Sequence, residues 1–408
     1  MKQHLLFTPG PVNVSQNVRE AICKQDICHR EIDFDYLLQS IEKKLLTLFE
    51  IKNRAKYRAV VITGSGTAAN ESMLSSVVGE KNILILSNGE FGERLNGISK
   101  IYNENTFLLD FGWGEELSLN KIKAFLEMQK IDVIAMVHHE TSSGMLNPLE
   151  KIGNLAKSHD AIFIVDCVSS AGAEEINFEK CNIAFCSSSS SKAIGSYPGL
   201  SFVVGKTEEF ENLKNLPTKS MYLSLYKFYD FIKTFSQTPN TPAVHLFYAL
   251  DQALSNILSE GIQNRYVNLR DKANKLRQGM LGLGLKFVIN QKDMCSILTA
   301  VYTPSHVDVT ILRQRLREKS IIIYEGKGCF KNRAFQVGSI GDLSFNDIEY
   351  FLDSLKMVLD SFKPTREILP IIELVKVSSL VKTKSQIQKF PQVNKKISTN
   401  VPISKATL

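Results

Sequence analysis

Three groups of residues could do chemistry, and each follows a predicted strand. The first is the run Gly64-Ser65-Gly66-Thr67-Ala68-Ala69, which comes after an apolar stretch and opens a predicted helix. Two glycines let the backbone approach an anion closely, and amides at a helix start, together with the hydroxyls of Ser65 and Thr67, can bind a phosphate. The run also matches the loose dinucleotide pattern GxGxxA, so the kind of phosphate stays open at this point.

The other two are Asp166 and Lys192. Asp166 ends the apolar run IFIVD, and ligands of parallel sheets bind beyond such strand ends, although an aspartate there can also cap the next helix. Lys192 follows five consecutive serines, Ser187 to Ser191, just past the next predicted strand. A lone lysine is ordinarily a solvated surface charge and a serine run can be a linker. The position of Asp166 and Lys192 at strand ends favours a functional role for both.

A phosphate loop, a carboxylate and a lysine at strand ends are together the parts that hold pyridoxal phosphate. The aspartate would keep the pyridine nitrogen protonated, so that the ring accepts electrons from the substrate Cα. The lysine would form a Schiff base and move a proton between Cα and the cofactor. A nicotinamide dehydrogenase is the weaker interpretation, because it needs no such lysine and because Ser87-Asn88 provides no acidic residue for a ribose.

A sheet must position these residues, and the middle of the chain has the pattern of one. Short, β-branched apolar runs alternate there with helical patterns, which is typical of a mostly parallel sheet covered by helices on both sides. The predicted strands are Arg58–Thr63, Asn82–Ser87, Asn105–Leu109, Asp132–His138, Ala161–Asp166, Ile183–Ser187 and Leu200–Val204. The predicted helices between them are Thr67–Val78, Leu119–Gln129 and Leu149–His159. The predicted fold class is α/β.

After Pro242 the pattern changes to a long amphipathic stretch, broken near Gly261, and then to short apolar runs between helical patterns. We therefore expect a large cofactor-binding α/β domain with its N-terminal segment at residues 1–255. A smaller α+β domain would occupy residues 256–362. The remainder, 363–408, is rich in Lys, Ser, Gln, Asn and Pro and is predicted to be a disordered tail.

The net charge of +7 belongs entirely to that tail, because the residues before Lys363 carry 40 basic and 40 acidic side chains. This balance argues against a nucleic-acid-binding protein as a whole. The seven cysteines form no CxxC pair, which predicts reduced thiols in a cytoplasmic protein and neither a disulfide framework nor a metal site. No stretch approaches the roughly 20 apolar residues that cross a bilayer, so we expect no membrane association.

Several motifs in order resemble the class V, fold type I, aminotransferases, and most closely the 2-aminoethylphosphonate–pyruvate transaminases. The resemblance extends from Leu5 to about Phe362. It rests on LLFTPGPVNVS at the N-terminus, CHREIDF, TGSGTAANE, SNGEFGER, HHETSSGMLNP, IVDCVSSAG, SSKAIGSYPG, SLYKFYD, NTPAVH and YEGKG. It implies a fold type I transferase with pyridoxal 5'-phosphate and a homodimer with its active sites at the subunit interface.

The resemblance also implies roles for individual residues of this chain. Lys192 would form the internal aldimine and Asp166 would pair with the ring nitrogen. The cofactor phosphate would be bound by Ser65, Gly66, Thr67, Ser191 (where relatives have Asn or Gln) and Thr241 of the neighbouring subunit. The ring would be flanked by Phe91 and Val168, with Thr141 near its phenolic oxygen. Gly10, between Pro9 and Pro11, would line the substrate entrance.

One position departs from the family. Relatives have an arginine before an apolar residue and glycine near the C-terminus, and this arginine binds the substrate's acid group. Here Gln336 stands in that place, in Ala334-Phe335-Gln336-Val337-Gly338. Glutamine offers no charge and no bidentate fork, which costs roughly 1.5–3 kcal/mol of substrate binding. Arg333 or Lys327 are the candidates to replace it.

The sequence therefore predicts an aminotransferase that moves an amino group between a small primary amine or amino acid, similar to aminoethylphosphonate, and a 2-oxo acid. A pyridoxal-phosphate lyase, decarboxylase or other tailoring enzyme is the alternative, because the acid-binding arginine is missing. A degenerate relative that serves as a scaffold, with the basic tail as its interaction arm, is a further alternative. The intact Lys192 and Asp166 argue against it.

Overall fold

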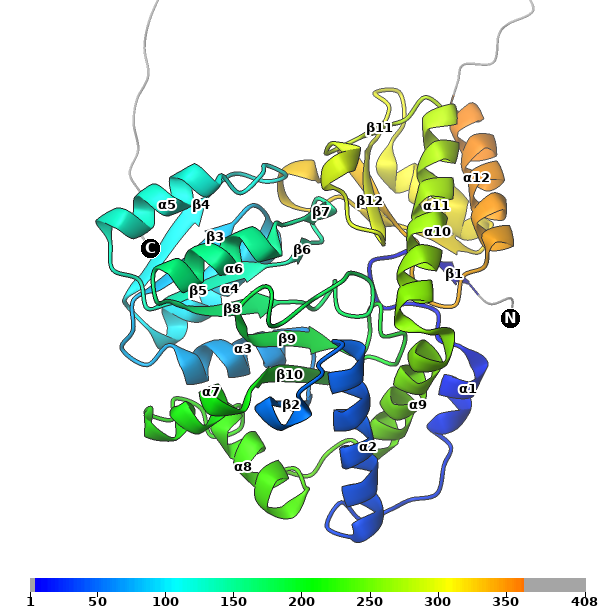
Figure 1. Ribbon diagram of the computed structural model, residues 1–408. Coiled ribbons are helices and arrows are strands. Elements are labelled where there is room, and N and C mark those ends of the chain that lie inside the picture. Colours follow the sequence, from blue (N-terminus) through cyan, green and yellow to red (C-terminus); the bar gives the residue numbers. More distant parts are fainter. Residues whose placement is uncertain (1–3, 363–408) are drawn as a thin grey trace, which may run out of the picture. The chain divides into compact units, whose positions relative to one another are not determined.

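A seven-stranded sheet forms the centre of the structure, a computed structural model that describes residues 4–362 (Figure 1). Its strands lie in the order β2-β10-β9-β8-β5-β3-β4, and β10 alone runs antiparallel to its neighbours. The strands are β2 (Tyr57–Thr63), β3 (Ile83–Ser87), β4 (Thr106–Asp110), β5 (Val133–Val137), β8 (Ile162–Asp166), β9 (Ile183–Ser189) and β10 (Leu200–Lys206). The predicted mostly parallel α/β sheet is confirmed, with every strand within two residues of its predicted bounds.

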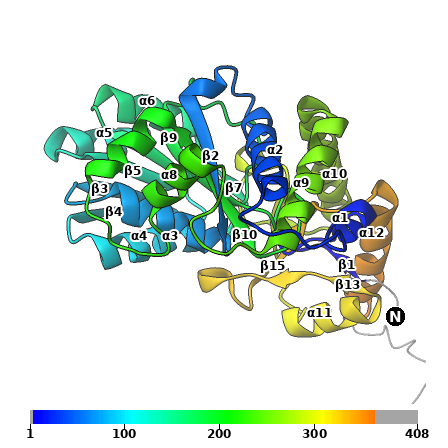
Figure 2. The same ribbon diagram turned by 90° about the horizontal axis from the view of Figure 1, so that it is seen from below.

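Helices cover both faces of this sheet, because strands such as β3 and β5 are buried along their whole length. Figure 2 shows α3 and α4 on one side of the sheet and α5 and α6 on the other. The helices of this part are α1 (Gln16–Ala21), α2 (Ile32–Leu48), α3 (Gly66–Val77), α4 (Glu90–Tyr102), α5 (Leu119–Met128), α6 (Leu149–Ser158), α7 (Thr207–Asn212), α8 (Leu225–Phe235) and α9 (Val244–Glu260). The sequence analysis did not predict α4, because two internal glycines, Gly92 and Gly97, lower its helix propensity.

The last third of the described chain forms a smaller antiparallel sheet in the order β11-β12-β15-β14. Its strands are β11 (Lys286–Phe287), β12 (Leu298–Tyr302), β14 (Tyr324–Glu325) and β15 (Ala334–Gly338), and its helices are α10 (Ile262–Gly282), α11 (Val309–Glu318) and α12 (Phe345–Asp360). The break that was predicted near Gly261 separates α9 from α10, and Gly261 has a φ of +85°. Left-handed backbone of this kind favours glycine.

The N-terminus joins this smaller sheet region and not the large one. Strand β1 (Leu5–Leu6) pairs in parallel with β13 (Ile321–Ile322), and the ring of Phe7 stacks on Phe351 at 4.6 Å. The apolar residues form separate cores within one compact unit. The domain boundary at residue 255 stays a prediction.

Two other expectations concern the whole chain. Among residues 4–362, no helix has the length and apolarity that crossing a membrane requires. All seven cysteines are free thiols. The predicted tail at 363–408 lies outside the described residues.

Candidate active site

The predicted phosphate loop forms the turn between β2 and α3. Ser65 is the N-cap residue of α3, its side chain is exposed, and its hydroxyl does not cap the helix. The amides of Gly66 and Thr67 lie in the first turn, where backbone N–H groups have no partner within the helix. A Cβ on Gly66 would lie 2.7 Å from Val168 Cγ2, so this turn packs directly against Val168 after β8. The start of α3 can therefore bind an anion.

Asp166 ends β8 and is 3 % exposed. Its Oδ1 accepts a hydrogen bond from the amide of Val168 at 2.8 Å, and its Oδ2 accepts one from Asn70 Nδ2 at 2.6 Å. Burial raises the pKa of Asp166, while these hydrogen bonds and the positive charges of Arg94 and Lys192 lower it. A turn follows β8, so Asp166 does not cap a helix.

Asn70 holds this carboxylate, and sequence reasoning missed it. It lies one turn after Gly66 on the buried face of α3, and its Oδ1 accepts a hydrogen bond from Ser187 Oγ in β9. The signal was available, since position 70 falls on the same face as the buried Gly66 and Met73 at helical spacing. Ser187 to Ser189 are the end of a buried strand and not a linker.

Lys192 lies next to Gly10. A Cβ on Gly10 would be 2.5 Å from Lys192 Cδ, and Gly10 has a φ of +137°, so glycine alone fits this close approach. Burial and the nearby charges of Lys327 and Arg94 together lower the pKa of Lys192 to about 8, while the charge of Asp166 opposes this shift. A large fraction of this amine is therefore neutral near pH 8, as a nucleophile or base requires.

A buried carboxylate positions Phe91. Glu140 is 0 % exposed and accepts hydrogen bonds from the amides of Phe91 at 3.2 Å, Gly92 at 3.1 Å and Ser142 at 3.1 Å. It thereby satisfies the first amides of α4 and holds the backbone that carries Phe91. Glu140 lies within the HHETSSG motif, but a charge in the middle of a buried segment was the signal that sequence reasoning did not use.

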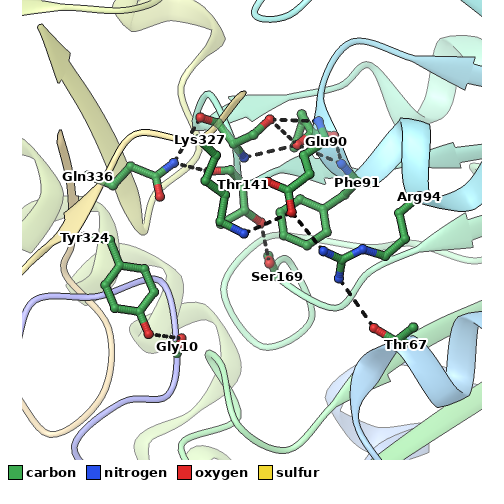
Figure 3. A network of polar contacts seen from close by, with 12 residues as sticks. Gly10, Thr67, Glu90, Phe91, Arg94, Thr141, Ser169, Tyr324, Lys327 and Gln336 are labelled. Carbon is green, nitrogen blue, oxygen red and sulfur yellow. Dashed lines mark hydrogen bonds and ion pairs between the residues drawn. The ribbon is translucent and has the colours of Figure 1, made fainter. Parts of the chain in front are cut away.

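Thr141 and Gln336 are joined by hydrogen bonds between distant parts of the chain. Thr141 Oγ1 and Ser169 Oγ lie 2.7 Å apart, and both residues are buried. Gln336, in β15, donates from Nε2 to the backbone oxygens of Thr141 at 2.7 Å and Ser142 at 3.0 Å. Figure 3 shows the amide nitrogen turned toward this segment and the amide oxygen turned away from it. Gln336 thus ties the turn after β6 (His139–Glu140) to β15.

A group of charges lies over the Phe91 ring (Figure 3). Glu90 Oε1 lies 3.1 Å from Lys327 Nζ and 2.9 Å from Arg94 Nη2. The cations of Lys327 and Arg94 lie 5.1 and 4.7 Å from the ring centroid of Phe91. Arg94 also reaches Thr67 Oγ1 at 3.5 Å, on the side of the phosphate loop. Sequence reasoning named Lys327 as a candidate but missed Glu90 and Arg94.

Three predicted site residues lie outside this network of contacts. Arg333 is exposed just before β15, where its backbone contacts Thr303 and Phe330. Thr241 is exposed between α8 and α9, and the neighbouring Ala243 amide donates to Thr63 Oγ1 at 3.3 Å. Ser191 is half-buried beside Lys192. Their predicted roles stay predictions.

Comparison with known proteins identifies the family of this chain. A family model described as aminotransferase class V matches residues 20–345. The 2-aminoethylphosphonate–pyruvate transaminase of Phocaeicola vulgatus is 31 % identical over 88 % of this chain and 99 % of its own length. The chain belongs to the class V aminotransferase family.

Other relatives of this aminotransferase agree. An uncharacterised aminotransferase of Methanocaldococcus jannaschii is 33 % identical over 83 % of this chain and 88 % of its own. The crystal structure of ureidoglycine–glyoxylate aminotransferase from Bacillus subtilis superposes with a TM-score of 0.83 at 26 % identity, covering 89 % of this chain and 95 % of that one. The crystal structure of alanine–glyoxylate aminotransferase from Nostoc sp. superposes with a TM-score of 0.83 at 27 % identity. The match covers 88 % of this chain and 96 % of that one. The fold is therefore that of the fold type I aminotransferases, as the sequence predicted.

Proposed function

We propose that this aminotransferase uses pyridoxal phosphate, which Lys192, Asp166 and the start of α3 would hold. The fit is supported by an anion-binding helix start, by a buried carboxylate that Asn70 fixes, and by a lysine pressed against Gly10. Phe91 and Val168 would provide the apolar faces for the flat ring. Ser65, Gly66 and Thr67 would bind the phosphate, with Arg94 beside Thr67 as a further cation.

The observation that carries this proposal is the placement of Lys192, which lies against Gly10 and close to the charge of Asp166. The lysine's pKa near 8 makes the amine available as a nucleophile toward an aldehyde and afterwards as a base. When bound, the cofactor would supply an electron-accepting ring. Lys192 Nζ would then take a proton from the amine-bearing carbon of the substrate and return it on the other side of the reaction.

The other residues hold the reacting groups in place. Asp166 would keep the proton on the ring nitrogen, because Asn70 and the Val168 amide fix its carboxylate while it stays out of water. Thr141 and Ser169 would face the ring's phenolic oxygen. Gly10 would line the substrate entrance, where its carbonyl accepts a hydrogen bond from Tyr324 at 3.3 Å.

We propose as substrates a small primary amine or amino acid, similar to aminoethylphosphonate, and a 2-oxo acid. The names of the relatives from Phocaeicola vulgatus and other bacteria support this class. We also propose a homodimer, with Thr241 as a phosphate ligand for the neighbouring subunit, and a cytoplasmic location, on the strength of seven free thiols.

One observation favours a second candidate function, a lyase, decarboxylase or other tailoring reaction on the same cofactor. Gln336 replaces the family's acid-binding arginine, so the substrate's acid group is held differently. The products separate the two functions, because a transaminase consumes one 2-oxo acid for each amine, whereas a lyase releases ammonia or phosphate without one.

The test uses Lys192→Ala alongside the wild-type chain, both incubated with pyridoxal phosphate. The wild-type protein is expected to gain a visible absorption band and to lose it when a suitable amine is added from a panel of amines, amino acids and aminophosphonates. K192A is expected to show neither the band nor turnover. Lys206→Ala, at the end of β10, is the matched control and should behave as wild type. Turnover retained in K192A would refute the proposal.

A further inference from the structure

Gln336 has no donor left for a substrate. The side chain is buried, at 1 % exposure of the residue, and both N–H groups face the backbone oxygens of Thr141 and Ser142. Its Oε1 is buried and has no partner among the described residues. An amide oxygen is a hydrogen-bond acceptor, and so are the oxygens of a carboxylate or phosphonate, so this oxygen disfavours binding of such an acid group. Gln336 is therefore a positioning residue for the Thr141 turn, and the acid group of a substrate needs a different cation.

Two cations lie over the Phe91 ring, and each has different further neighbours. Arg94 lies against Thr67, at the phosphate end. Lys327 follows β14, whose Tyr324 contacts Gly10 at the substrate entrance. The Lys327 side chain is 36 % exposed, so a ligand from solvent can reach it, and its charge is close enough to Lys192 to lower the lysine's pKa. Lys327 is the cation on the substrate side.

Glu90 already forms an ion pair with Lys327. Its Oε1 bridges Lys327 and Arg94 at 3.1 and 2.9 Å, and its side chain is 27 % exposed. A carboxylate between two cations resembles, in charge and shape, the acid group that the site would otherwise take. If Glu90 releases Lys327, its ion pair with Arg94 still balances its charge.

We propose that Lys327 binds the acid group of the substrate and that Glu90 occupies Lys327 until the substrate exchanges with it. This inference rests on the proposed function, because it assumes that the reacting group lies at Lys192. The substrate class is then an amine or 2-oxo compound with one terminal carboxylate or phosphonate. Glu90 lowers the affinity for every such ligand, because each has to displace a resident carboxylate.

The experiment measures binding of acids that cannot react. The holoenzyme is titrated in a calorimeter with ethylphosphonate and with propionate, which have the acid group but neither an amino nor an oxo group. We expect Glu90→Gln to bind both about two- to fivefold more tightly, which is the range of a partly exposed ion pair. Lys327→Gln should bind them about tenfold more weakly. In the double variant E90Q/K327Q, the tighter binding caused by E90Q should disappear, because Lys327, the cation that E90Q frees, is absent.

The exposed pair Glu116–Lys292, at 2.9 Å, provides matched controls of the same residue types. E116Q and K292Q should keep wild-type affinities. Unchanged affinity in K327Q, or weaker binding in E90Q, would overturn the proposal. A gain from E90Q that persists without Lys327 would also overturn it, by moving the acid group to Arg94. The visible cofactor band is recorded for every variant. A wild-type chain that takes up no pyridoxal phosphate would refute the proposed function and the inference that rests on it, whereas unchanged acid affinities in variants that keep the band would refute this inference alone.

Discussion

At the scale of single residues, two buried histidines have a charge state that is set by burial. His138 and His139 precede Glu140 and are almost fully buried. Burial lowers the pKa of His138 to about 4 and of His139 to about 3, and the hydrogen bond between His139 and the Ser169 carbonyl opposes the shift only in part. Both imidazoles stay neutral in the folded chain throughout the range in which this enzyme would work.

This burial predicts a stability cost in acid. The unfolded chain protonates His139 below its ordinary value of 6.5, while the folded chain does not until about 3, so stability falls as the pH falls between these values. Between pH 7 and pH 5 the loss from this residue is about 2 kcal/mol. When the pH is lowered from 7 to 5, the free energy of unfolding, measured by urea denaturation, should therefore decrease by about 2 kcal/mol less in His139→Gln than in wild type.

The exposed His306 is the control for this measurement. H306Q should lose as much stability as wild type between the two pH values, because water surrounds that imidazole in both states. An H139Q variant that retains the full wild-type loss would contradict the assignment of the acid sensitivity to His139.

At the scale of elements, strand ends and helix starts meet at the cleft, and the sequence predicted these parts unequally. The strand that ends in Asp166 and the turn at Gly64–Thr67 could be predicted, because apolar runs and glycines are local signals. Glu90 and Arg94 could not, because α4 contains glycines and because an ion pair with Lys327 depends on a contact across the fold. The hydrogen bonds from Gln336 Nε2 to the Thr141 turn could not be predicted either, since they depend on tertiary packing.

The start of α4 gives a prediction at this scale. Glu140 accepts three amides and the Ser142 hydroxyl, and an amide group in its place would turn N–H groups toward those donors. Glu140→Gln should therefore lower the free energy of unfolding by about 1–3 kcal/mol. It should also weaken pyridoxal-phosphate uptake, because Phe91 loses its support.

Glu150 tests whether burial is the cause. It lies in the first turn of α6 and pairs with Lys180 at 2.9 Å, but its side chain is 45 % exposed. E150Q should change the stability by less than about 1 kcal/mol. Equal losses in E140Q and E150Q would show that the buried network contributes nothing of its own. Both are measured by urea denaturation at pH 7.

At the scale of the whole molecule, the proposed dimer determines whether one chain makes a complete site. The family resemblance assigns Thr241 to the neighbouring subunit's phosphate, and Thr241 is exposed. We expect light scattering to give about twice the mass of one 45.8 kDa chain. A sharper test mixes two inactive variants, Lys192→Ala and Thr241→Glu, after mild dissociation.

If Thr241 serves the partner, half of the random pairs contain one native site, so about a quarter of the wild-type activity should return. If Thr241 serves its own chain, no site becomes native and the mixture stays inactive. Mixing Lys192→Ala with a Thr238→Glu variant is not suitable as a control, because Thr238 is buried. Mixing K192A with itself provides the baseline.

The pairing of β1 with β13 has a consequence for how the enzyme is made. Gly10 contacts Lys192, but the segment that carries it is fastened by Leu5 and Leu6 to Ile321 and Ile322, near the opposite end of the described chain. During synthesis on the ribosome, Leu5 and Leu6 emerge about three hundred residues before Ile321 and Ile322, so β1 must wait for its partner strand. The central sheet can form earlier, but the segment that carries Gly10 is fixed only after Ile321 and Ile322 have emerged.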